Sequence, residues 1–134
     1  MAVLAVSDTH ALIWYATGAT RKLGREARRV FERADAGRAA VHVPTITLVE
    51  IADEARKGSI RFDEPFSAWC EGLFSSGRFF SASLSLATVF CAEGLYAIAE
   101  RSDRLIAATA VQLGLPLITR DLDIGDAAGI EIIW

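Results

Sequence analysis

Short apolar runs that alternate with helical patterns are the feature that most constrains the fold of this chain. Two of these runs, Val3–Val6 and Ala40–Val43, are each followed by residues that favour a helix. A weaker run lies at Phe79–Ser81, and two more, Leu115–Thr119 and Ile130–Trp134, come late in the chain. Strands that are apolar throughout are buried on both faces, which is typical of a parallel sheet covered by helices. The pattern therefore predicts an α/β fold with a central parallel sheet.

Helices are predicted from apolar spacing and from the residues that start or stop a helix. Residues 25–36 place apolar side chains on one face and arginines on the other, and Gly37 follows them. Pro44 opens a further helix, since proline loses no hydrogen bond in the first helical turn, and this helix ends at Gly58. Further helices are predicted at 11–15, 66–74, 84–93 and 104–113, the last with Ser102 or Asp103 as its N-cap. The predicted order is β-α-α-β-α-α-β-α-α-β-β.

Length and composition indicate one folded domain. The chain has 134 residues, of which 52% are hydrophobic and 23% are charged, so a disordered chain is excluded. We expect a single domain over residues 1–134. Its longest uncharged stretch, Leu105–Thr119, is too short to cross a membrane, and Asp8 interrupts the first apolar run, so no signal peptide is visible. We expect a cytoplasmic protein with no membrane partner, in which Cys70 and Cys91 are buried, reduced thiols.

The charge balance gives a mixed indication about nucleic acid. The net charge of −3 argues mildly against a polyanion partner. Residues 21–38 nevertheless hold seven basic and three acidic side chains. This basic face fits an RNA backbone, although a solvated helix face is the simpler interpretation. Its arginines include Arg21, Arg25, Arg28 and Arg29.

Four carboxylates fall at equivalent places in the predicted fold. Asp8 and Asp121 each follow a strand, Asp103 opens a helix, and Glu50 lies about two turns into the helix after the second strand. Ligands of open α/β sheets bind beyond the carboxyl ends of the strands. Each aspartate also suits a helix cap or a turn, so placement alone leaves a structural role open. Glu50 is harder to explain in this way because its sequence neighbours are apolar.

Carboxylates that share a pocket repel one another unless they bind protons or a cation. A ligand set of hard oxygens, without cysteine or paired histidine, favours Mg²⁺ or Mn²⁺. Such a cation lowers the pKa of water and shields the charge of a phosphate. The four acids therefore point to phosphodiester hydrolysis.

Four segments resemble, in order, the motifs of PIN-domain proteins, and a fifth resembles their closing strand. The segments are Ser7–Trp14, Thr45–Ala52, Ser102–Ala110, Leu115–Asp121 and Gly129–Trp134. The resemblance implies a three-layer α/β/α sandwich and a metal-dependent endoribonuclease that acts on RNA. The short chain without appended domains resembles the VapC branch, the toxins of toxin–antitoxin pairs. That branch implies a homodimer that a cognate antitoxin neutralises.

The resemblance also implies roles for individual residues. Those that match the family's acidic, metal-binding and catalytic site are Asp8, Glu50, Asp103 and Asp121, and those that support it by hydrogen bonds are Thr9 and Thr119. Asp123, Arg104 and His10 are further candidates. Asp123 lies two residues past Asp121, and either of the two could face the metal. Arg104 could contact a phosphate or form a structural salt bridge. His10 could contact the substrate or be a polar packing residue.

Two alternatives remain at this stage. The chain could be a catalytically inactive PIN scaffold that acts as a binding or regulatory module, although it keeps all four acids. It could also be another α/β protein with an acidic pocket. A phosphatase of the haloacid dehalogenase type needs an aspartate two residues after Asp8, where His10 stands, and a receiver domain needs paired acids there.

Overall fold

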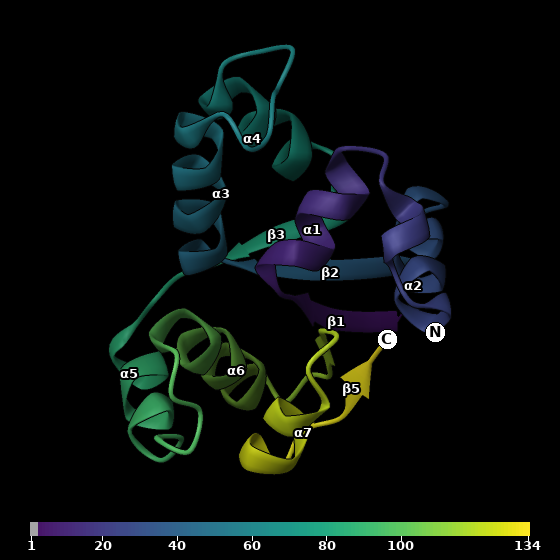
Figure 1. Ribbon diagram of the computed structural model, residues 1–134. Coiled ribbons are helices and arrows are strands. Elements are labelled where there is room, and N and C mark those ends of the chain that lie inside the picture. The colour runs from purple at the N-terminus through teal and green to yellow at the C-terminus, as the bar shows by residue number, and fades with distance from the viewer. Residues whose placement is uncertain (1–2) are drawn as a thin grey trace.

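The computed structural model describes residues 3–134, which form a five-stranded parallel sheet with helices on both faces (Figure 1). The strand order across the sheet is β3-β2-β1-β4-β5, and every neighbouring pair is parallel. The strands are β1 Val3–Ser7, β2 Ala39–Pro44, β3 Phe79–Ala82, β4 Leu117–Ile118 and β5 Ile132–Ile133. The helices are α1 Thr9–Ala16, α2 Arg25–Asp35, α3 Thr45–Lys57, α4 Phe66–Ser75, α5 Leu86–Glu93, α6 Arg101–Leu113 and α7 Leu122–Ala128, with a 3₁₀ turn at Thr20–Lys22.

The sheet separates two hydrophobic cores, as the alternation of side chains along a strand requires. Ala5 of β1 and Ile118 of β4 pack with α1, α2, α4 and part of α3. Their neighbours Val6 and Leu117 point the other way and pack with α5, α6 and α7. Figure 1 shows this second group of helices below the sheet. The expected three-layer α/β/α sandwich with a central parallel sheet is confirmed.

The chain between the last two strands differs from the predicted order. A helix, α7, connects β4 to β5, where the sequence was expected to pass from strand to strand directly. This helix has only seven residues and contains Gly125, so it lacks the long apolar repeat by which helices are recognised. It is buried at Ile124 and Gly125, where it packs against the second core.

Two smaller predictions are also corrected. Helix α6 begins at Arg101, and its N-cap is Glu100, whose carboxylate accepts hydrogen bonds from the backbone N–H groups of Ser102 and Asp103. The predicted caps, Ser102 and Asp103, therefore lie inside the first turn. Cys70 and Cys91 are free thiols as expected, but both are half-buried.

Within residues 3–134, no helix combines the length and the apolar character needed to cross a membrane.

Gly125 fits a space that admits no side chain, which makes it a test of the packing between α7 and β5. A Cβ at this position would lie 2.5 Å from Ile132 Cγ1 and 3.2 Å from the carbonyl oxygen of Ile130. We expect Gly125→Ala to lower the free energy of unfolding by about 1–3 kcal/mol, because overpacking outweighs the gain in helix propensity. The matched control is Gly72→Ala in α4, where a Cβ would meet no atom within 4 Å. Urea denaturation should show the control equal to or more stable than the parent chain, and equal stability of both variants would contradict the packing.

Candidate metal centre

Asp8 is held in place by its own backbone and by the strand beside it. Its backbone N–H donates to the Ile118 carbonyl at 3.0 Å, which joins the carboxyl ends of β1 and β4. Its carboxylate oxygen Oδ1 accepts from the Ala11 N–H at 2.9 Å, so Asp8 is the N-cap of α1.

Asp103 and Asp121 approach the same edge from other elements. Asp103 lies in the first turn of α6 and is half-buried. Asp121 follows β4 and is the N-cap of α7, since its Oδ1 accepts from the Asp123 N–H at 3.0 Å. The buried hydroxyl of Thr119 accepts from the Asp121 N–H at 3.3 Å and so fixes the turn after β4.

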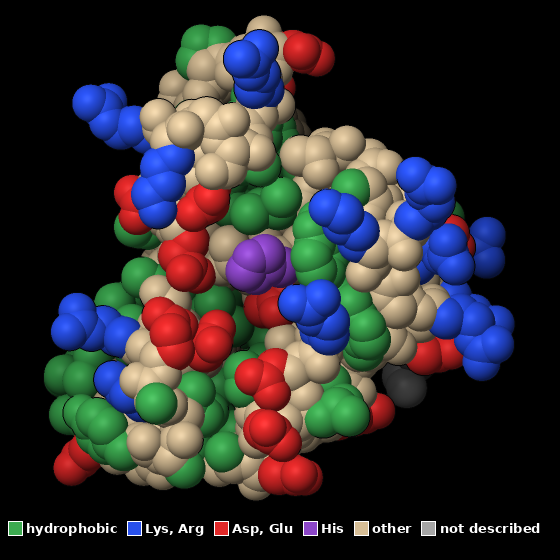
Figure 2. Space-filling model, in the orientation of Figure 1, with side chains coloured by type: hydrophobic (Ala, Val, Ile, Leu, Met, Phe, Trp, Pro, Cys, Tyr) green, Lys and Arg blue, Asp and Glu red, His purple; other side chains and the backbone are tan. Residues whose placement is uncertain are grey.

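These three aspartates line one cavity of about 360 Å³. Its other walls carry aromatic, basic and polar side chains. The lining residues are Asp8, His10, Trp14, Asp103, Thr119, Arg120, Asp121, Ile124 and Trp134. Figure 2 shows this arrangement from outside, with a histidine near the centre of the face and carboxylates above it, below it and to its left.

Glu50 lies in the adjoining cavity, which Thr9 and His10 also line. The Thr9 hydroxyl donates to Glu50 Oε1 at 2.5 Å, and this bond joins the first turn of α1 to the second turn of α3. Thr9 is itself buried and directly follows Asp8. The contact therefore fixes the position of Glu50 relative to the Asp8 carboxylate, and His10 lies between the two cavities.

Burial and mutual repulsion oppose ionisation of the central acids. Burial, and after it the negative charges of Glu100, Glu50, Asp8 and Asp121 in that order of importance, together raise the pKa of Asp103 to about 6. Burial also raises the pKa of Asp8, while the Ala11 N–H, Thr119 and His10 act to lower it. The other three predicted site acids, Asp8, Glu50 and Asp121, thus all oppose the ionisation of Asp103.

The donor chemistry of this site fits a divalent cation. Among residues 3–134, none of the four acids forms an ion pair with a basic side chain. Their negative charge is therefore uncompensated, and their oxygens are the ligands that Mg²⁺ and Mn²⁺ prefer. In the same part of the chain, no three acidic, histidine or cysteine side chains lie close enough to surround an ion. A bound cation would therefore need to draw the carboxylates closer together.

The remaining candidates occupy different surroundings. His10 lines both cavities, whereas Asp123 is exposed and absent from their walls. Arg104 turns away from the acids. Its guanidinium donates to the Ile98 carbonyl at 3.0 Å and lies 4.4 Å from the Tyr96 ring centroid. These contacts are structural, and Arg104 does not line the acidic cavity.

Four side chains at the cavity were not singled out as site residues from the sequence: Trp14, Arg120, Trp134 and the apolar Ile124. Arg120 stands between Thr119 and Asp121, so its position in the fourth motif was the available signal. Trp14 ends the first motif and could have been found in the same way. Trp134 reaches the cavity only because β5 follows β4 in the sheet, and no local pattern indicates that.

The family assignment follows from a comparison of the sequence with known families. The PIN domain sequence profile matches residues 5–130 of the 134-residue chain. The chain belongs to the PIN-domain family. This confirms the resemblance seen in the four motifs. A comparison with curated proteins gave no significant match.

Solved structures share the fold at low sequence identity. A chain of VapBC2 from Rickettsia felis, bound to a DNA fragment from its promoter, matches with a TM-score of 0.68 and 13% identity, covering 97% of each chain. A chain of DNA-bound VapBC from Salmonella typhimurium matches with a TM-score of 0.66 and 18% identity, covering 98% of this chain and 97% of that one. A chain of FitAcB from Neisseria gonorrhoeae matches with a TM-score of 0.63 and 16% identity, covering 97% of this chain and 96% of that one. The whole PIN-domain chain is therefore similar to these proteins in fold.

The raised pKa of Asp103 predicts a stability cost that depends on pH. In the folded state its ionised form is disfavoured, so the cost is complete above about pH 6 and absent below the ordinary pKa of 3.8. We expect Asp103→Asn to raise the melting temperature by a few degrees near pH 7.5 in EDTA, with no gain near pH 3.5. Thermal unfolding followed by circular dichroism measures both, with Asp63→Asn in the exposed loop after α3 as the matched control. A lower melting temperature for Asp103→Asn at neutral pH would contradict the repulsion.

Proposed function

We propose that this PIN-domain chain is a metal-dependent endoribonuclease, a hydrolase of RNA phosphodiester bonds, and the toxin of a toxin–antitoxin pair. The observation that carries the proposal is the cavity lined by Asp8, Asp103 and Asp121, whose carboxylates have no basic partner among the described residues. We propose that residues 1–134 form one catalytic domain and that it acts in the cytoplasm, where its RNA substrate is found.

The carboxylates would hold Mg²⁺ or Mn²⁺ at the edge of the sheet. A divalent cation, when bound, shields the charge of a phosphate and makes water a better nucleophile. Asp8 is the best-fixed ligand, because two backbone hydrogen bonds hold it. Asp103 and Asp121 reach the same cavity from α6 and from the turn after β4.

We propose that Glu50 accepts a proton from the attacking water. Its Oε1 already accepts a hydrogen bond from the Thr9 hydroxyl, which leaves Oε2 as the freer oxygen for this role. The water oxygen bonds to phosphorus, the bond from phosphorus to the leaving sugar oxygen breaks, and that oxygen takes a proton from solvent. Thr9 acts through Glu50 and is a positioning residue, as Thr119 is for the turn that carries Asp121.

We further propose a homodimer and a cognate antitoxin as protein partners. The fold similarity to chains of VapBC and FitAB complexes supports an antitoxin partner. Exposed apolar side chains on and after α5 support an interface, since Leu86 and Tyr96 are each 68% exposed and Phe90 is 64% exposed. The mean hydropathy of +0.32 agrees with a chain that covers such a surface.

Metal-dependent cleavage is the direct test of the proposed activity. A folded RNA should be cut in Mg²⁺ or Mn²⁺ and left intact in EDTA. Asp8→Asn should lower the rate by at least about a hundredfold, because it removes charge from the best-fixed ligand. The matched control, Asp63→Asn, removes an acid from an exposed loop and should cleave normally. Cleavage that persists in EDTA and in Asp8→Asn would refute the proposal. Absence of cleavage and of metal binding by the parent chain, with tight binding of a protein partner, would establish the inactive scaffold instead.

The Thr9–Glu50 hydrogen bond predicts a graded effect. Thr9→Val keeps the shape of the side chain but removes the donor, so we expect cleavage to fall by about 10–100-fold. Thr9→Ser restores the hydroxyl and should recover most of the rate. Steady-state kinetics should place the loss in kcat rather than KM, because Glu50 acts on the water. Equal rates for Thr9→Val and the parent chain would remove Thr9 from the mechanism.

A further inference from the structure

We propose that one side of the acidic cavity is a binding site for a single unpaired nucleotide of the substrate. This aromatic–basic wall consists of His10, Trp14 and Arg120. The inference rests on the proposed RNA hydrolysis. The carboxylates cannot themselves bind the bases and phosphates next to the cut bond, and the wall would provide a surface for them.

Trp14 is the centre of the wall. Its half-buried indole lines the acidic cavity, and its ring centroid lies 5.7 Å from that of His10 and 5.9 Å from that of Trp134. The two neighbouring rings hold the indole in one orientation. Aromatic side chains at a binding cavity are the groups on which proteins stack single-stranded bases, with little dependence on sequence.

Two cations lie near the Trp14 ring, and one of them, Arg120, belongs to the wall. The Arg120 guanidinium lies 5.5 Å from the Trp14 centroid, and the Lys22 ammonium of the 3₁₀ turn lies 6.0 Å from it. In the part of the chain that the structure describes, neither side chain forms an ion pair. Arg120 also lines the cavity, so its donors are available to a phosphate there.

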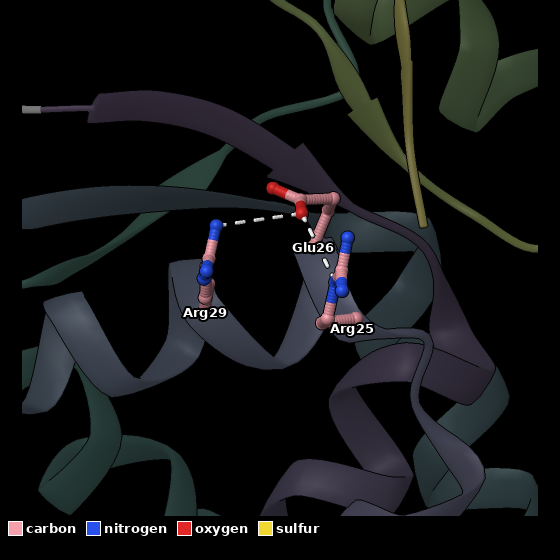
Figure 3. Close-up of polar contacts among 3 residues, drawn as sticks. All are labelled: Arg25, Glu26 and Arg29. Atoms are coloured by element: carbon pink, nitrogen blue, oxygen red, sulfur yellow. Dashed lines mark ion pairs between the residues drawn. The ribbon is translucent and has the colours of Figure 1, made fainter.

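The basic face of α2 is arranged differently. Arg25 and Arg29 both lie beside Glu26, with nitrogen–oxygen distances of 3.7 and 3.5 Å (Figure 3). Neither lines the acidic cavity. Arg120, which does line the cavity, follows β4 and is not part of the arginine-rich helix.

The shape of the site favours unpaired nucleotides. A base inside a duplex has both faces covered by its neighbours, so it has no free face for Trp14. The cavity of about 360 Å³ accommodates a base turned out of its stack but not a duplex. The acids and the wall line the same cavity, so a phosphate bound there would lie near Arg120 as well as near a metal ion held by the carboxylates.

Binding of a short single-stranded oligoribonucleotide in Mg²⁺ tests the wall, with Asp8→Asn as the parent so that the RNA stays intact. Fluorescence anisotropy gives the Kd. We expect Trp14→Leu to raise the Kd about tenfold and Trp14→Phe to change it little, because phenylalanine still stacks.

Arg120→Gln should raise the Kd and reduce the slope of log Kd against log salt by about 0.7. Arg25→Gln, the matched loss of one arginine, should leave both unchanged. The same RNA annealed to its complement should bind more weakly and should not respond to Trp14→Leu.

The outcomes separate the wall from the catalytic proposal. The wall would be overturned if Arg120→Gln changed neither the Kd nor the salt slope and Trp14→Leu did not change the Kd. The nuclease proposal would still stand in that case if the unsubstituted chain cleaved RNA in the presence of metal. Failure of that chain to cleave, with the binding losses as expected, would refute the nuclease and keep the wall. If thermal unfolding shows that Trp14→Leu does not fold, Arg120→Gln decides the question, since Arg120 is exposed and its loss leaves the core unchanged.

Discussion

The parallel pairing of β1 with β4 is the constraint on which the site depends. The hydrogen bond from the Asp8 N–H to the Ile118 carbonyl places the ends of two strands, distant in sequence, side by side. Thr119 and Asp121 follow one strand, and Asp8 follows the other. Since the two strands are buried in both cores, the position of these carboxylates is set by the packing of the whole sheet. The sheet therefore brings these carboxylates to one cavity, and only the last approach to a cation would be left to side-chain movement.

That rigidity has an electrostatic cost. The same packing that fixes the aspartates also buries them beside one another, and the pKa values of Asp8 and Asp103 rise as a result. An ion pair with a lysine or an arginine would lower this cost, but none of these acids forms one among the described residues. Here Arg104, the nearest basic residue in sequence to Asp103, is engaged with the Ile98 carbonyl and the Tyr96 ring instead. The charge of the carboxylates is thus kept available for a cation.

The fold was largely predictable from sequence because its strands are short, apolar and separated by recognisable helices. The exception, α7, is too short to show a period, and its formation depends on contact with Ile132, which no local pattern reveals. The acids were predictable as a set because each follows a strand or opens a helix. Their detailed partners were not, since Glu100 caps α6 through a backbone contact and Trp134 reaches the cavity only through the strand order.

The net charge of −3 shows why a total is a poor guide to the partner of such a chain. The carboxylates at the cavity form no ion pair among the described residues, while the cations Lys22 and Arg120 lie near the Trp14 ring. In the proposed function, a polyanion would meet the acids through a metal ion and would meet Arg120 directly. A net charge adds these two groups together, although a nucleic acid would interact with each of them separately. The fold brings Arg120 and the acids to the same cavity, so the distribution of charge there is a better guide to a nucleic-acid partner than the total.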